Sequence, residues 1–211
     1  MSRNLTELND FLIVERRPGV RIIVNIAGRF SLANRRNAQG DRRVFACRAV
    51  NLSPHAIALA SPVSGKAGER VMAHIDHLGK LEGAVLRVLE RGFVMSVSAS
   101  EEEREKLAVK IEWLGKNKDH DASDRRFDKR IVPVNPYSWM ILPDGCRETC
   151  LVLDLSVSGA AISADTVPEI GAVLAVGMVE GRVVRHFDGG FAVEFIQSQS
   201  RDTVEAMVIR E

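Results

Sequence analysis

Three arginines near the middle of the chain have a type and spacing suited to an anionic, planar ligand. Arg126 and Arg130 are four positions apart, and Arg125 directly precedes the first of them. The planar fork of a guanidinium group can bond two phosphate oxygens, can bond the O6/N7 edge of guanine and can stack on a purine ring. Two arginines at this spacing are also typical of a solvated basic linker, so the pair alone does not define a site.

A second polar run follows an apolar stretch and supplies a carboxylate, a hydroxyl and a glycine. These residues are Asp154, Ser156 and Gly159. The carboxylate can accept hydrogen bonds from N–H donors, and the hydroxyl can donate to a phosphate oxygen. The glycine permits either a close backbone approach or the positive φ of a tight turn. The alternative interpretation of the same run is a turn capped by its own Asp and Ser side chains.

The chain contains two copies of one sequence pattern, in the same order. The matched blocks are Glu15 to Arg21 with Asp124 to Arg130, Cys47 to Ser53 with Cys150 to Ser156, Gly68 with Gly171, and Glu82 to Phe93 with Glu180 to Phe191. Because the blocks keep their order, we infer an internal duplication, and we predict two similar domains.

Within each copy, short runs rich in branched residues predict β-strands, and turn signals such as Asp144-Gly145 and Asp188-Gly189-Gly190 separate them. The expected strands are Ile22 to Ile26, Val44 to Val50, Val71 to Ile75, Gly83 to Leu89, Phe93 to Val97, Tyr137 to Leu142 and Thr149 to Leu153. Many short strands at regular spacing favour closure into a small barrel.

Each copy is expected to end in a helix. Ser100 and Glu103 have the spacing of a capping box and precede an apolar stripe. A second stripe, which includes Val204 and Val208, follows Ser200. Residues 115–123 are polar, and we predict that they link a domain at 15–114 to a domain at 124–211.

The two polar runs together resemble the PilZ domain family, whose signature is Arg-x-x-x-Arg followed by Asp/Asn-x-Ser-x-x-Gly. The resemblance covers residues 124 to 209 and, through the repeat, most of residues 15 to 114. It implies a mainly β fold of two small antiparallel six-stranded β-barrels, each ending in an α-helix. It also implies binding of cyclic di-GMP, a bacterial second messenger. The implied binding residues are Arg125, Arg126, Arg130, Asp154, Ser156 and Gly159.

The first copy carries a partly degenerate version of the same motif, which makes it a possible second site. It keeps Arg17, Arg21, Asn51 and Ser53, but has Ala56 where the second copy has a glycine. An alanine would be strained there if the position required a positive φ. Asn51 also accepts hydrogen bonds as a neutral group, whereas the aspartate of the second copy is charged.

Composition limits the remaining possibilities. The chain is 45% hydrophobic and 27% charged, as is ordinary for a globular protein. No apolar run approaches the roughly 20 residues of a membrane helix, and the first residues lack a secretory signal, so we expect no membrane span and a cytoplasmic location. Three cysteines without further ligands at suitable spacing predict reduced thiols and no metal site.

We therefore expect a non-enzymatic receptor or adaptor without a cofactor, since no phosphate-binding loop of the Walker type and no nucleophile elbow is present. Binding of cyclic di-GMP would change the arrangement of the domains and regulate a protein partner in motility, exopolysaccharide or biofilm-type processes. One alternative is a PilZ-like interaction module that does not bind the ligand.

A second alternative is a nucleic-acid-binding barrel, because residues 1–118 carry 20 Lys and Arg against 13 Asp and Glu. With one Tyr and two Trp, however, the chain offers few stacking platforms, and a nucleic-acid partner is not expected.

Overall fold

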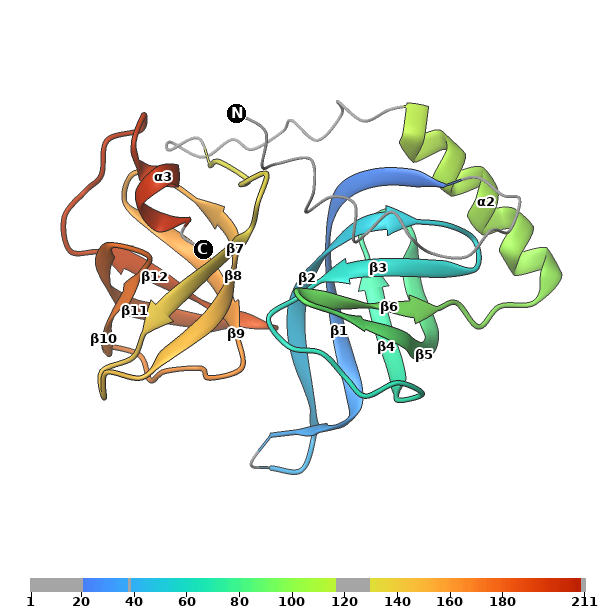
Figure 1. The fold of residues 1–211 in the computed structure, drawn as a ribbon, viewed down its shortest axis with the longest axis horizontal. Coiled ribbons are helices and arrows are strands. Elements are labelled where there is room, and N and C mark those ends of the chain that lie inside the picture. The colour runs from blue at the N-terminus through green and yellow to red at the C-terminus, as the bar shows by residue number, and fades with distance from the viewer. Residues whose placement is uncertain (1–20, 38, 117–129, 210–211) are drawn as a thin grey trace. The chain divides into compact units, whose positions relative to one another are not determined.

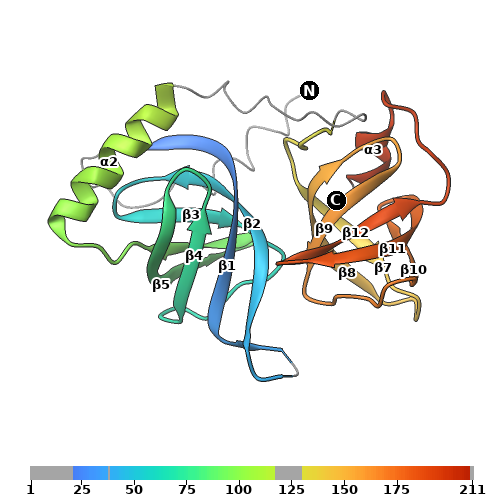
Figure 2. The same cartoon turned by 180° about the vertical axis from the view of Figure 1, so that it is seen from behind.

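The computed structural model describes residues 21–37, 39–116 and 130–209 of the chain. These residues form two compact units, each a closed antiparallel barrel of six strands (Figures 1 and 2). The predicted fold class is thereby confirmed. Three of the predicted site residues, Arg17, Arg125 and Arg126, lie outside the described residues.

The first barrel is built from the N-terminal copy of the repeat. Its strands are β1 (Ile22–Arg36), β2 (Arg42–Leu52), β3 (Ala56–Ala60), β4 (Arg70–Ile75), β5 (Gly79–Leu89) and β6 (Gly92–Ser96). They follow the order β1-β2-β3-β6-β5-β4, and β4 pairs back with β1 to close the barrel. In β4, Val71, Ala73 and Ile75 are buried and alternate with more exposed residues, as a strand with one core-facing side requires.

The second barrel repeats this topology. Its strands are β7 (Tyr137–Ile141), β8 (Arg147–Leu155), β9 (Gly159–Ala164), β10 (Val173–Val176), β11 (Val179–Phe187) and β12 (Gly190–Phe195). Their order is β7-β8-β9-β12-β11-β10, closed by the pairing of β10 with β7. This is the order of the first barrel with each strand number raised by six, which agrees with the duplication inferred from the sequence.

The correspondence extends to irregularities in the strand pairing. The β2–β3 register shifts between Ala49 and Asn51, and the β8–β9 register shifts between Val152 and Asp154. Likewise, β5–β6 and β11–β12 each contain one shift, the latter between Val183 and Arg185. A bulge of this kind adds one residue to a strand and bends it locally. Both copies therefore carry the same two bends.

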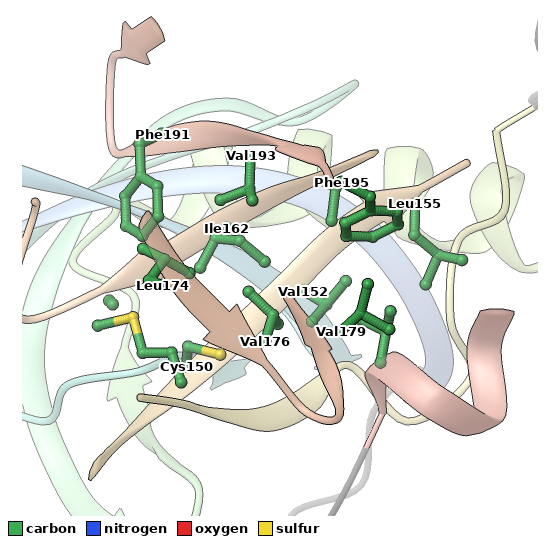
Figure 3. Close-up of a cluster of buried hydrophobic side chains, with 14 of the residues drawn as sticks. Cys150, Val152, Leu155, Ile162, Leu174, Val176, Val179, Phe191, Val193 and Phe195 are labelled. Atoms are coloured by element: carbon green, nitrogen blue, oxygen red, sulfur yellow. The ribbon is translucent and has the colours of Figure 1, made fainter. Parts of the chain in front are cut away.

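The interior of the second barrel is filled by branched and aromatic side chains that converge from its strands (Figure 3). Phe191, Leu155, Ile162 and Val176 are fully buried in this cluster. A filled core means that polar side chains of the barrel must project from its outer surface, where a ligand could reach them.

A helix follows each barrel in the sequence. The helix α2 (Glu101–Lys116) begins with the predicted capping box, in which the Ser100 N–H donates to Glu103 Oε2 over 2.8 Å and the Glu103 N–H donates to Ser100 Oγ over 3.3 Å. Gly115 and Lys116, placed in the linker by the sequence prediction, belong to this helix.

The helix after the second barrel is short. It is α3 (Val204–Val208), and both of its terminal valines are buried. The hydroxyl of Ser138 on β7 donates to the carbonyl of Val208, which ties the end of the helix to the barrel. Among the described residues, no helix has the length and apolar character needed to cross a membrane.

Candidate functional site

A short backbone pairing brings the first motif against the second. Ile131 forms an isolated antiparallel bridge with Leu155, the last residue of β8. The Ile131 N–H donates to the Leu155 carbonyl over 2.7 Å, and the reciprocal bond is 2.9 Å long. Ile131 also packs against the barrel core. Because Arg130 precedes Ile131 and Asp154 precedes Leu155, this bridge holds both charged residues on the same part of the barrel.

Arg130 and Asp154 form an ion pair. The Nη1 atom of the arginine donates to Oδ1 of the carboxylate. Their side chains are 32% and 26% exposed, so the pair is accessible from solvent yet partly shielded. Hydrogen bonds between two ionised groups are roughly twice as strong as neutral ones. The guanidinium is therefore held in place and still presents further N–H donors to a ligand.

Ser156 organises the turn between β8 and β9. Its N–H donates to the carbonyl of Gly159 over 2.8 Å, and its hydroxyl oxygen accepts from the Ser158 N–H over 3.3 Å. The two serine hydroxyls lie 3.2 Å apart. The interpretation of this run as a side-chain-capped turn is thus correct for Ser156, and the same residue lines a cavity.

Gly159 is required for close packing and not for an unusual backbone angle. Its φ is not positive, and neither is that of Ala56 at the matching position of the first barrel. The condition under which Ala56 would be strained, a positive φ, is therefore not met. A Cβ atom added to Gly159 would instead lie 2.4 Å from the carbonyl oxygen of Val193 on β12. The missing side chain lets β9 and β12 approach each other.

The motif residues of the second copy line one cavity of about 300 Å³ on the outer side of the barrel. The complete lining is Arg130, Asp154, Ser156, Ser158, Gly159, Ala160, Ala161, Val184, Arg185, Ala192, Val193 and Glu194. All four motif residues that fall within the described chain are thus brought together, although they come from separate parts of the sequence.

The sequence prediction missed the residues contributed by β11 and β12. Arg185 and Glu194 are exposed charged side chains that also line the cavity. One signal could have identified Arg185, because the repeat aligns it with Arg87, so both copies carry an arginine just after the matching bulge. Glu194 aligns with Ser96 and offers no such signal.

The matching residues of the first barrel are arranged differently. Asn51 is buried, with 6% of its surface exposed, whereas Asp154 lies at a cavity. The hydroxyl of Ser53 donates to the Ala56 carbonyl over 2.9 Å and accepts from the Ala56 N–H over 3.0 Å, so it is engaged within the turn. Arg21 is exposed and directly precedes β1.

The cysteines differ in their surroundings. Cys150 is fully buried in the core of the second barrel, and this burial raises the pKa of its thiol to about 12. Cys146 is exposed, and a hydrogen bond with the Asp144 carboxylate raises its pKa above the ordinary value. Within the described ranges, no group of three or more His, Cys, Asp or Glu residues is placed to hold a metal ion.

The second barrel is a small six-stranded β-domain with a cavity lined by charged and small side chains. Residues 124–210 match the model of the PilZ domain. This match covers the second barrel. A comparison with curated protein sequences gives no match.

Several solved structures are similar to this chain at low sequence identity. PlzA of Borreliella burgdorferi, solved in complex with c-di-GMP, is 12% identical, with a TM-score of 0.29 and coverage of 96% of this chain and 97% of PlzA. The PilZ domain of Escherichia coli YcgR, solved with c-di-GMP, is 12% identical and has a TM-score of 0.37. The match covers 51% of this chain and 100% of the YcgR domain. MotI of Bacillus subtilis, an inhibitor of motility, is 11% identical and has a TM-score of 0.29. The match covers 89% of this chain and 94% of MotI.

Proposed function

We propose that this protein is a non-enzymatic receptor for cyclic di-GMP and that its main site is the cavity of the second barrel. One observation carries the proposal: Arg130, Asp154, Ser156 and Gly159, the described residues of the PilZ signature, all line a single cavity. Its volume of about 300 Å³ is at the lower end of the range for small-molecule pockets, which suits a cavity completed by further residues or by part of a ligand lying outside it.

The chemistry of the cavity fits a ligand with two phosphates and two guanines. The Arg130 guanidinium can bond phosphate oxygens or the O6/N7 edge of guanine, and Asp154 can accept from the N1 and N2 donors of guanine. Ser156 and Ser158 add hydroxyl donors. Arg125 and Arg126, outside the described residues, complete the proposed set by their place in the signature.

We further propose that binding alters the arrangement of the two barrels and so regulates a protein partner, in processes such as motility, exopolysaccharide production or biofilm formation. Arg130 is the first described residue after 117–129, and that segment also contains two of the proposed ligand-binding arginines. A ligand held by all three arginines would constrain the connection between the barrels. Small-angle scattering with and without saturating ligand tests this, and an unchanged profile would rule it out.

The first barrel is proposed as a weaker second site at Arg17, Arg21, Asn51 and Ser53. Burial of Asn51 and the use of the Ser53 hydroxyl within its own turn both favour a smaller contribution from this copy. Its affinity is therefore expected to be lower than that of the second barrel.

Calorimetric titration of the full chain with cyclic di-GMP tests the proposed function. Wild type should bind, Arg130→Ala should lose the main site, and Arg21→Ala should have a smaller effect. Thermal unfolding of each variant without ligand controls for folding. If folded wild type gives neither heat nor a thermal shift with the ligand, the alternative of a ligand-independent interaction module replaces this proposal.

A further inference from the structure

Two charged residues of the cavity lining, Arg185 on β11 and Glu194 on β12, are not part of the PilZ signature. The strand register places Asp154 opposite Ala161, Ala161 opposite Ala192, and Ala192 opposite Arg185. These four residues form one row across four adjacent strands. Neighbouring strands are about 4.8 Å apart, so the backbones at the two ends of the row are separated by roughly 14 Å along the sheet.

The two inner residues of this row are alanines, whose short side chains project little from the surface of the sheet. Their methyl groups, together with Gly159 in the next row, leave open space between the longer side chains at the two ends. The cavity therefore extends across the row, from the Arg130–Asp154 pair on one side to Arg185 on the other.

Arg185 is supported from its own strand. Its guanidinium carbon lies 5.8 Å from the centre of the Phe187 ring, within the range of a cation–π contact. Phe187 pairs with Gly190, and a Cβ atom on that glycine would come within 3.0 Å of the ring. The glycine thus leaves room for the ring beside Arg185, and the ring limits the positions that the guanidinium can take.

The cavity carries two arginines and two carboxylates. Arg130 and Asp154 stand at one end of the row and Arg185 at the other, while Glu194 lies on β12 in the next row, opposite Gly159 on β9. Cyclic di-GMP is itself built from two identical halves, each with one phosphate and one guanine. An arginine suits the phosphate, and a carboxylate suits the N1 and N2 donors of guanine.

We propose that Arg185 binds the second phosphate of cyclic di-GMP and that Glu194 binds the edge of its second guanine. This inference rests on the proposed function and adds to it a residue pair that makes the site selective for a ligand with two guanines. The first barrel has an arginine, Arg87, at the position of Arg185, but Ser96 replaces the glutamate, so it has no equivalent pair.

The test is calorimetric titration of the full chain with cyclic di-GMP and with the cyclic GMP–AMP hybrid, in which adenine replaces one guanine. Arg185→Ala should weaken cyclic di-GMP binding by about 10- to 100-fold, the loss expected for hydrogen bonds between charged groups. Arg201→Ala is the control, because Arg201 is exposed, lies in the segment before α3 and does not line the cavity. It should bind as wild type does.

The hybrid ligand tests Glu194 separately. Wild type should prefer cyclic di-GMP over the hybrid, because adenine lacks the N1–H and N2 donors that a carboxylate accepts, and Glu194→Ala should lose most of this preference. Equal affinities for Arg185→Ala and Arg201→Ala, or an unchanged preference in Glu194→Ala, would overturn the inference while leaving the receptor function intact. Absence of binding to wild type would overturn the receptor function as well.

Discussion

The Arg130 guanidinium donates to the Asp154 carboxylate, so each motif of the PilZ signature positions the other. In the proposed site, a ligand would share this arginine with an internal carboxylate. Because an arginine has several N–H donors and can bond both at once, the aspartate would support the arginine as well as contact the ligand.

Replacing Asp154 by asparagine should show how much the charge of this side chain contributes to the affinity for cyclic di-GMP. The substitution keeps the size of the side chain and reproduces Asn51 of the first barrel, but it removes the charge that holds Arg130. We expect cyclic di-GMP affinity to fall about tenfold, because a neutral acceptor forms weaker hydrogen bonds. Calorimetry measures this, with the exposed and remote Asp202→Asn as the control. Wild-type affinity in Asp154→Asn would contradict the assigned role.

Ile131 should affect ligand binding without contacting the ligand. Its bridge to Leu155 and its contact with the core position the preceding arginine. In Ile131→Ala, weaker packing should loosen this segment, so we expect lower affinity and a modest loss of stability. Val132→Ala changes the next residue, which is exposed, and should alter neither quantity. The idea fails if both variants bind cyclic di-GMP equally well.

Gly159→Ala should damage both the fold and the site of the second barrel. The new methyl group would lie 2.4 Å from the Val193 carbonyl oxygen, so β9 and β12 must move apart. We expect a loss of about 1–3 kcal/mol in the free energy of unfolding, as is typical of overpacking, together with weaker binding. Denaturant unfolding measures the first effect and calorimetry the second. The matched change in the first barrel, Ala56→Gly, removes a methyl group and should leave the main site unaffected.

The thiols of Cys146 and Cys150 should differ sharply in reactivity. Cys146 is exposed, whereas Cys150 is buried with a pKa of about 12. In the folded protein, a disulfide reagent should therefore modify Cys146 well before Cys150, as peptide mapping by mass spectrometry can measure. Because the pKa of Cys146 is raised by Asp144, its rate should increase with pH up to that raised value.

Asp144→Asn provides the control for this electrostatic effect. Removing the carboxylate should lower the pKa of Cys146, so the thiolate fraction and the reaction rate near pH 8 should both rise. Equal modification of Cys150 and Cys146 in the native protein would contradict the placement of Cys150 in the core.

The strands and the duplication could be predicted because both leave local marks in the sequence. The Asp144-Gly145 turn and the branched runs of each copy depend on neighbouring residues, and α2 begins at the predicted capping box. The outer row of the cavity could not be predicted, because the pairing of Asp154 with Ala161 and of Ala192 with Arg185 depends on the register of strands distant in the chain. The close approach of Gly159 to the Val193 carbonyl could not be predicted either, because it depends on the pairing of β9 with β12 in the folded barrel.

The two bulges of the second barrel also explain how a hollow can exist on its outside. The outer wall of a closed barrel is convex, so a regular strand array offers little concave surface there. Asp154 and Arg185, at the two ends of the cavity row, each follow directly after a bulge. A bulge bends its strand and increases the local twist. Curvature introduced by two inserted residues, Leu153 and Val184, thus helps to turn part of a convex wall into a shallow basin.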